Sequence, residues 1–251
     1  MTDARRSVTV VTGASAGIGA AVAVRLAHQG HDLVLGYRRS ADGARAVADR
    51  CASAGARVLS VGGDVADDAD VARLFAAAAE LGPLTGLVAN AGMTAHLGDL
   101  ADTPVDVVRR VVDVNLVGVL LCLRRAAQVM STARGGAGGA IVTISSSSTT
   151  SGSAHEYVHY AAAKAGVEVA TLGLARELAG EGVRVNCVAP GLVDTGIHAD
   201  AGDATRPARM APQIPLGRAG EPDEIAAAVV WLLGPEASYV TGATLRVTGG
   251  R

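Results

Sequence analysis

The sequence has few aromatic residues and no block of basic residues. Only 2% of its 251 residues are Phe, Trp or Tyr, although 49% are hydrophobic, so the core must be built from Ala, Val, Leu and Ile. That composition suits Val-rich buried strands covered by Ala-rich helices. The formal net charge is −2, and without a basic block nothing indicates a nucleic-acid partner or an acidic membrane surface.

Long hydrophobic runs and paired cysteines are also missing. No uninterrupted apolar stretch is long enough to cross a membrane, and the charged start MTDARRSVTVV lacks the apolar segment of a signal peptide. Cys51, Cys122 and Cys187 lie far apart, and an odd number without a CxxC pair favours free thiols in a reducing compartment. We therefore expect a cytoplasmic protein with no membrane partner, in which the cysteines are small buried hydrophobic residues.

Short Val- and Ile-rich runs alternate with longer Ala-rich runs along the chain. This alternation predicts an α/β fold, with a single doubly wound parallel sheet of the Rossmann type, seven strands and helices on both faces, in one domain over 1–251. Residues 192–220 carry three prolines and little apolar periodicity, so we expect an irregular substrate lid there. The expected strands cover 8–13, 32–37, 57–63, 85–92, 140–146, 183–191 and 243–250, and the expected helices cover 17–29, 41–54, 67–81, 104–132, 157–180 and 222–233.

Unusual residues stand at the ends of six of the expected strands. In a doubly wound sheet, ligands bind at the carboxyl ends of the strands, where these residues would meet. Packing alone could explain any one of these residues, but it is a poor explanation for six of them at the same edge of the sheet. In chain order they are Gly13, Arg38, Asp64, Asn90, Ser146 and Pro190.

Residues 12–19, TGASAGIG, lie where the first strand would meet the first helix. Glycines at such a junction permit a tight turn and let the backbone approach a pyrophosphate, and the helix N-terminus offers free N–H groups. The three residues between Gly13 and Gly17 depart from the GxGxxG spacing of most dinucleotide folds. The position after the first strand still favours nucleotide binding over an ordinary loop.

Tyr160 and Lys164 are four residues apart in an expected helix, so their side chains share one face. An ammonium beside a phenol favours the phenolate, and we therefore expect the pKa of Tyr160 to fall toward neutrality. Such a tyrosine is able to give a proton to a carbonyl oxygen or to take one from an alcohol. Because YxxxK alone is common on solvated helices, the prediction depends on the upstream motifs.

Together, TGASAGIG, NAG at 90–92, Asn115, a Ser after ISS, YxxxK at 160–164 and PG at 190–191 resemble the short-chain dehydrogenase/reductase family. The resemblance covers essentially the whole chain and is strongest to the branches that are 3-oxoacyl-carrier-protein-reductase-like or glucose-dehydrogenase-like. It implies that Tyr160 is the acid/base. It also implies that Lys164 lowers the pKa of that tyrosine and holds the nicotinamide ribose, and that Asn115 anchors a water that relays protons.

The resemblance also implies a set of residues that contact a dinucleotide. The implied set is Gly13, Ser15, Gly17, Ile18 and Gly19 along the dinucleotide, Asp64 and Val65 at the adenine, Asn90, Ala91 and Gly92 on the side of the adenosine ribose, and Pro190, Gly191 and Thr195 at the nicotinamide.

The end of the second expected strand, GYRRS at 36–40, contains two arginines and no carboxylate. A carboxylate there would bond the ribose 2′-OH and repel a 2′-phosphate, whereas a guanidinium suits a phosphate. We therefore predict NADP(H) rather than NAD, with Arg38 as the first phosphate ligand and Arg39 as the second. Many family members have another arginine within the glycine turn, where this chain has Ala16.

Four consecutive serines, 145–148, follow the fifth expected strand. Strand position fixes where a side chain points, and it favours Ser146 as the catalytic serine that bonds the substrate oxygen. The usual family spacing to the tyrosine favours Ser147 instead. We select Ser146.

The run HEYVH at 155–159 matches the HExxH signature of zinc proteases. On one helix His155 and His159 would face the same way, but Glu177, a carboxylate near the usual spacing, would lie about five turns farther along. A zinc hydrolase also leaves TGASAGIG and NAG unexplained, so we predict no metal site. Glu156 either faces the substrate mouth or stabilises the start of the helix.

We predict a carbonyl reductase or alcohol dehydrogenase with a small-molecule substrate, which the resemblance implies is a homotetramer or homodimer. The Ala- and Val-rich stretches 104–132 and 157–180 fit a second, intersubunit face. A non-catalytic NADP sensor or scaffold on the same fold is the alternative. It predicts a damaged catalytic set, whereas all four catalytic residues are present.

Overall fold

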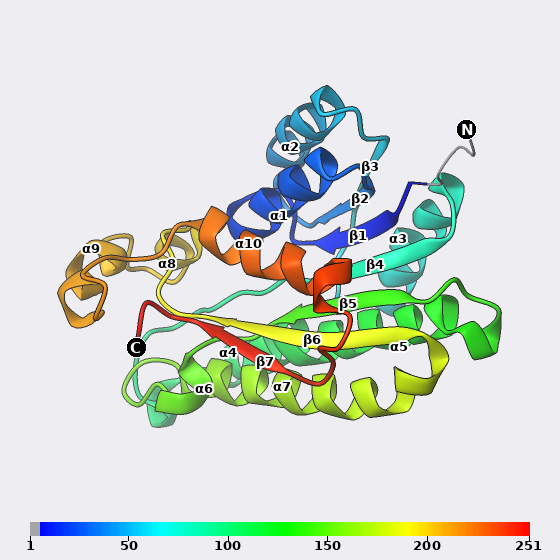
Figure 1. The fold of residues 1–251 in the computed structure, drawn as a ribbon. Helices are drawn as coiled ribbons and strands as arrows, with labels where there is room; N and C mark the ends of the chain where they lie inside the picture. The colour runs from blue at the N-terminus through cyan, green and yellow to red at the C-terminus, as the bar shows by residue number, and fades with distance from the viewer. Residues whose placement is uncertain (1–5) are drawn as a thin grey trace.

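The computed structural model describes residues 6–251, which form a seven-stranded parallel sheet with helices on both faces (Figure 1). The strand order is β3-β2-β1-β4-β5-β6-β7, so the chain moves outward from β1 to β3 and then returns to place β4 beside β1. This is the doubly wound sheet predicted from the sequence. The strands are β1 (Val8–Thr12), β2 (Asp32–Tyr37), β3 (Val58–Gly62), β4 (Leu84–Ala89), β5 (Gly139–Ile144), β6 (Val183–Pro190) and β7 (Thr244–Val247).

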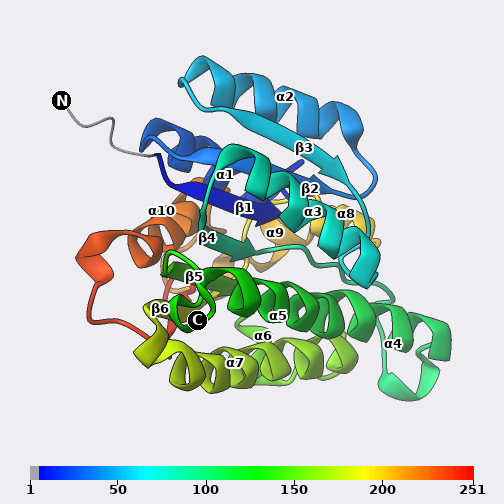
Figure 2. The same cartoon turned by 90° about the vertical axis from the view of Figure 1, so that its right-hand side faces the viewer.

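Two layers of helices cover the sheet. Helices α1, α2 and α10 pack on one face, and α3, α5 and α7 pack on the other (Figure 2). The helices are α1 (Gly17–His28), α2 (Ala41–Ser53), α3 (Asp68–Leu81), α4 (Val105–Val112), α5 (Gly118–Met130), α6 (Ser148–Ser151), α7 (Val158–Leu178), α8 (Ile197–Asp200), α9 (Arg206–Met210) and α10 (Pro222–Leu233).

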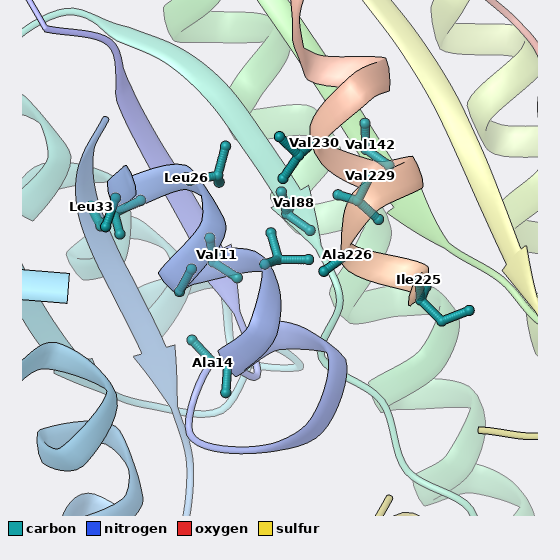
Figure 3. Close-up of a cluster of buried hydrophobic side chains, with 14 of the residues drawn as sticks. Val11, Ala14, Leu26, Leu33, Val88, Val142, Ile225, Ala226, Val229 and Val230 are labelled. Carbon is teal, nitrogen blue, oxygen red and sulfur yellow. The ribbon is translucent and has the colours of Figure 1, made fainter. Parts of the chain in front are cut away.

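The core consists mainly of aliphatic side chains, as the scarcity of aromatic residues requires, and Phe75 of α3 is an aromatic member. Every residue of β1 is buried, because a central strand of a parallel sheet is covered on both faces. On one face Val11 packs with Leu26 of α1 and Val229 of α10 in a single buried cluster (Figure 3). A second buried cluster joins the other face of the sheet to α3, α5 and α7. The three cysteines are free and buried, as expected.

The expected helix over 104–132 is wrong in one respect, because it is interrupted. A π-helical turn, Asp113–Val117, lies between α4 and α5. The side-chain amide of Asn115 within this turn donates to the carbonyl oxygen of Val111 at 2.8 Å and to that of Met93 at 2.7 Å. Such turns carry one extra residue. Here it accompanies an inward-facing Asn115 that holds the loop after β4.

The expected irregular stretch 192–220 contains two short helices, α8 and α9, which the sequence did not indicate. The two ends of the stretch are tied together, because Val193 pairs with Gly220 in an isolated parallel bridge. Both helices lie beyond the carboxyl ends of the strands, beside the C-terminus (Figure 1). No helix within 6–251 is both long and apolar enough to cross a bilayer.

Candidate active site at the carboxyl edge of the sheet

A cavity of about 870 Å³ runs along the carboxyl edge of the sheet. All six residues expected at the strand ends contribute to its wall. Every other residue expected to bind the cofactor or to act in catalysis also lines it, except Gly19 and Asn115, which are buried. We call the walls that follow β1 to β4 the nucleotide half, and the walls that follow β5 and β6 the substrate half.

The glycine turn after β1 is packed against the NAG loop after β4. The side-chain amide of Asn90 donates to the carbonyl oxygens of Thr12, at 2.9 Å, and Gly13, at 3.1 Å. The Thr12 hydroxyl in turn accepts the backbone N–H groups of Asn90 and Ala91. A Cβ on Gly19 would lie 2.3 Å from the Gly13 carbonyl oxygen, so only glycine fits there.

The N-terminus of α1 opens into the cavity. Its N-cap, Ala16, has no side chain that could accept a hydrogen bond from the first turn, and Ala16, Gly17 and Ile18 all line the cavity. The first backbone N–H groups of a helix lack intrahelical partners, and with the helix dipole they favour an anion. Thr195 faces this turn, because a Cβ on Gly17 would meet its methyl group at 3.3 Å.

Two exposed arginines line the cavity where β2 ends, as expected. The Arg38 Nε lies 3.1 Å from a carboxylate oxygen of Asp64, and Arg110 of α4 hydrogen-bonds the same oxygen. Burial alone would raise the pKa of Asp64, but the N–H of Ala66 and the two guanidinium groups together lower it. Asp64 therefore stays ionised and holds Arg38 at the cavity wall. The sequence pattern did not identify Arg110, because nothing local marks a residue on α4 as a partner of Asp64.

Lys164 is buried in the substrate half beside Tyr160. Its ammonium donates to the carbonyl oxygen of Ile144 at 2.8 Å and lies 5.8 Å from the centre of the Tyr160 ring. Burial lowers the pKa of Lys164 from 10.5 to about 8, because a low-dielectric site disfavours the charged form. The two side chains lie together as their spacing predicted.

The expected fall in the pKa of Tyr160 is not found in this structure. Burial raises the pKa of the phenol, and this effect exceeds the opposing effect of the Ser146 hydroxyl. A neighbouring ammonium lowers the pKa of a phenol, but here the cost of burying a phenolate is the larger effect. Tyr160 is therefore protonated at neutral pH, which suits a proton donor.

The four serines after β5 have different partners. The Ser145 hydroxyl bonds the Glu168 carboxylate at 2.8 Å, away from Tyr160, whereas the Ser146 hydroxyl lies near enough to Tyr160 to lower its pKa. The Ser147 backbone N–H donates to the Pro190 carbonyl oxygen. The geometry therefore favours Ser146 over Ser147 as the neighbour of the tyrosine hydroxyl.

Asn115 and Lys164 approach each other beneath the NAG loop. A Cβ on Gly92 would lie 2.8 Å from the Asn115 side-chain oxygen and 3.3 Å from the Lys164 ammonium. Because Gly92 has no side chain, the Asn115 carboxamide and the Lys164 ammonium both face the space that a Cβ at this position would fill.

The HEYVH residues do not share a helix face. Helix α7 begins only at Val158, so exposed His155 lies before it and pairs with Asp99, whereas buried His159 bonds the Ala95 carbonyl oxygen. Within 6–251 no three His, Cys, Asp or Glu side chains lie close enough together to bind one metal ion.

Glu156 faces the cavity and forms an ion pair with Arg206 of α9, whose guanidinium also lies 5.3 Å from the centre of the Tyr157 ring. Of the two alternatives for Glu156, the structure favours the substrate mouth. Sequence reasoning missed Arg206, since an arginine in an irregular segment carries no local signal of burial.

Comparison with known proteins gives concordant results. The family model described as enoyl-(acyl carrier protein) reductase matches residues 13–251. Over 244 residues the chain is 45% identical to cis-4-hydroxycyclohexanecarboxylate dehydrogenase of Sinomonas cyclohexanicum, which covers 97% of this chain and 95% of that protein.

Two solved structures have the same fold along nearly the whole chain. A short-chain dehydrogenase from Burkholderia cenocepacia in complex with NADP has a TM-score of 0.89, with 34% identity and 97% of both chains covered. The 3-ketoacyl-(acyl-carrier-protein) reductase from Brucella melitensis complexed with NADH also has a TM-score of 0.89, with 31% identity and 98% of both chains covered. The fold and these likenesses define an oxidoreductase of the Rossmann type. More particularly, the chain belongs to the short-chain dehydrogenase/reductase family.

Proposed function

We propose that this protein transfers a hydride between NADP(H) and a carbonyl or secondary alcohol, with Tyr160 as the acid/base. The observation that carries the proposal is the buried Lys164 ammonium beside a protonated Tyr160, at a cavity whose other half presents free helix N–H groups. A proton donor and an anion-binding turn on one cavity are what reduction of a carbonyl by a bound dinucleotide requires.

The nucleotide half fits a dinucleotide phosphate. The unpartnered N–H groups of α1 suit the pyrophosphate, and Arg38 and Arg39 suit a 2′-phosphate at the end of β2, where no carboxylate competes. The complex of the Burkholderia relative with NADP supports this choice, although the Brucella relative was crystallised with NADH. We therefore propose NADP(H) as the preferred cofactor.

The residues of the substrate half have separate roles in reduction. The bound cofactor supplies the hydride. Tyr160 gives its phenol proton to the substrate oxygen, and Ser146 bonds that oxygen while charge develops on it. The Lys164 ammonium stabilises the phenolate that results. Asn115, close to Lys164 beneath Gly92, holds the water through which the tyrosine recovers its proton. Oxidation of an alcohol follows the same steps in reverse.

The substrate that we propose is a small alicyclic or aliphatic ketone or secondary alcohol. Besides the rings of Tyr157 and Tyr160 and the charged side chains described above, the substrate half offers small polar and aliphatic side chains such as Ser147 and Val193, so it suits a saturated molecule. The Sinomonas relative is named as a dehydrogenase for cis-4-hydroxycyclohexanecarboxylate, a cyclic secondary alcohol with a carboxylate, which supports the same class. The stretch 192–220 would act as the lid of this site.

We also propose that the active form is a homodimer or homotetramer. Leu120 of α5 and the side chains of Val169 and Leu172 on α7 are exposed, on the helices where the sequence predicted an intersubunit face. Light scattering after gel filtration tests this directly. A monomer at micromolar concentration would contradict it.

The test of the proposed function is turnover. Purified protein is mixed with NADPH and a panel of cyclic and linear ketones, and nucleotide oxidation is followed by absorbance. We expect turnover of at least one ketone by the wild type and none above background by Tyr160→Phe. NADPH binding without turnover of any ketone or alcohol would favour the non-catalytic sensor instead.

A further inference from the structure

Arg206 is a buried cation in the substrate half that the proposed reaction does not use. It is the first residue of α9, its exposed fraction is 5%, and it lines the cavity. A buried guanidinium is costly unless its charge and its donors are matched, so such a residue needs an explanation.

The partners of Arg206 leave one edge of the guanidinium unused. Glu156 accepts a hydrogen bond from one terminal nitrogen, Nη2, at 2.7 Å, and its other carboxylate oxygen lies 2.7 Å from the second terminal nitrogen, Nη1, as an ion pair. Within 6–251 the Nε and Nη1 are buried and have no hydrogen-bond partner. Arginine has five N–H donors, and its Nε edge binds a carboxylate side-on. The pair with Glu156 therefore fixes the plane of the guanidinium and leaves that edge for another acceptor.

Tyr157 supplies a second donor at the same place. The Arg206 guanidinium lies over its ring, and burial raises the pKa of the phenol, so the hydroxyl keeps its proton. A protonated phenol and a guanidinium N–H can both donate to one anionic oxygen. The negative charge of Glu156 is balanced by its ion pair with Arg206, so no isolated negative charge lies here to repel an anion.

The distance from Arg206 to the reacting centre is short. Its guanidinium is 5.3 Å from the centre of the Tyr157 ring, and that ring is 5.4 Å from the Tyr160 ring in an edge-on contact. One aromatic ring therefore separates the cation from the proposed proton donor. A substrate that reached both would carry its acid group a few carbon atoms from the carbonyl.

We propose that Arg206, with Tyr157, binds a carboxylate of the substrate, and that the substrate class is a small oxo acid or hydroxy acid whose two groups are separated by a short apolar spacer. This inference rests on the proposed function for its carbonyl chemistry. The recognition of the anion by Arg206 stands on the geometry of the cavity.

The first experiment compares matched substrates. Reduction of 4-oxocyclohexanecarboxylate is compared with reduction of its methyl ester, which has the same ring and carbonyl but no charge. Charge-assisted hydrogen bonds are worth about 1.5–3 kcal/mol, which corresponds to roughly a 10- to 100-fold effect. We expect the wild type to prefer the acid by about that factor in kcat/KM, and Arg206→Gln to lose this preference through a higher KM for the acid. Reduction of the ester should change less than about threefold.

Arg209→Gln is the matched control, because Arg209 lies on the same short helix but is exposed and pairs with Asp203. It should keep the preference for the acid. Arg206→Lys keeps the charge without the planar donor edge and should fall between wild type and Arg206→Gln. Equal NADPH binding by all variants will show that the fold is intact.

A binding measurement separates failure of this inference from failure of the proposed function. Cyclohexanecarboxylate has no carbonyl to reduce, and calorimetry reports its binding in the presence of NADPH whether or not turnover occurs. Binding that is lost in Arg206→Gln and kept in Arg209→Gln supports the anion site even if no ketone is reduced. No binding by the wild type, or no preference for the acid over the ester, would overturn it. An equal loss of acid and ester reduction in Arg206→Gln would reduce Arg206 to a structural role.

Discussion

The two halves of the cavity are built by different means. The nucleotide half is mainly backbone: Gly19 packs against the Gly13 carbonyl, and the first turn of α1, which has no side-chain cap, lines the cavity. The substrate half is made of buried charged and polar side chains, among them Lys164 and Arg206, whose positions depend on partners distant in sequence. The first half is therefore sensitive to added atoms, and the second is sensitive to removed ones.

The largest effect is expected in the substrate half, from removing one oxygen atom. Tyr160→Phe deletes the proton donor, and general acid catalysis contributes about 100- to 10,000-fold to rates. We expect kcat to fall by that factor while the affinity for NADPH changes less than about threefold. Steady-state kinetics and a fluorescence titration measure the two quantities. An equal fall in kcat and in the affinity for NADPH would mean that Tyr160 has a structural role.

The nucleotide half should show the opposite pattern when one carbon atom is added. In Gly19→Ala the new Cβ would lie 2.3 Å from the Gly13 carbonyl oxygen, so the turn must move. We expect NADPH affinity to fall by about 100-fold, with a loss of stability of about 1–3 kcal/mol from overpacking. Gly180→Ala is the control, because a Cβ there meets nothing within 4 Å. Unchanged binding in Gly19→Ala would contradict the placement of the pyrophosphate.

A smaller effect is expected at the end of β2. Arg38→Ala removes a guanidinium that suits the 2′-phosphate, and the loss of a charge-assisted hydrogen bond corresponds to roughly 10- to 100-fold. NADPH affinity should fall by this factor, whereas NADH affinity should change little. Titration with both nucleotides measures the difference. A parallel loss of both would show that Arg38 acts only through its ion pair with Asp64.

The smallest effect is a pH dependence that is specific to the substrate half. Burial lowers the pKa of Lys164 from 10.5 to about 8, so the ammonium loses its proton as the pH rises through about 8. Since kcat/KM reports the free enzyme, we expect it to fall about tenfold per pH unit above 8. NADPH binding should depend less on pH.

The same shift has a consequence for stability. Between about pH 8 and 10.5 the unfolded chain binds a proton that the folded Lys164 does not, so Lys164 contributes a rise with pH to the free energy of unfolding, measured relative to Lys164→Met. In Lys164→Met this rise should disappear. Equal pH slopes for the two proteins across this window would contradict the burial of a titrating lysine.

The sequence predicted the nucleotide half better than the substrate half for a physical reason. Its features, such as the glycine turn at 12–19 and the end of β2, are local, because adjacent residues form the turn and the helix N-terminus. All seven strands were located for the same reason, since parallel strands appear as continuous Val-rich runs.

The parts that the sequence did not predict depend on contacts between distant residues. Arg110 reaches Asp64 from α4, and Arg206 reaches Glu156 from α9, and neither partner is indicated by spacing. The pKa of Tyr160 was misjudged because burial, which spacing does not report, outweighs a neighbouring charge. The choice between Ser146 and Ser147 could be made only in part from the sequence, because strand position favoured Ser146 and loop length favoured Ser147.

Binding of NADP(H) in the nucleotide half of the cavity is the step on which all of the proposed chemistry depends. The most direct test is a fluorescence titration of the wild-type protein with NADPH and, separately, with NADH. We expect one NADPH per chain, bound at least about tenfold more tightly than NADH. No binding of either nucleotide, or tighter binding of NADH, would contradict the account.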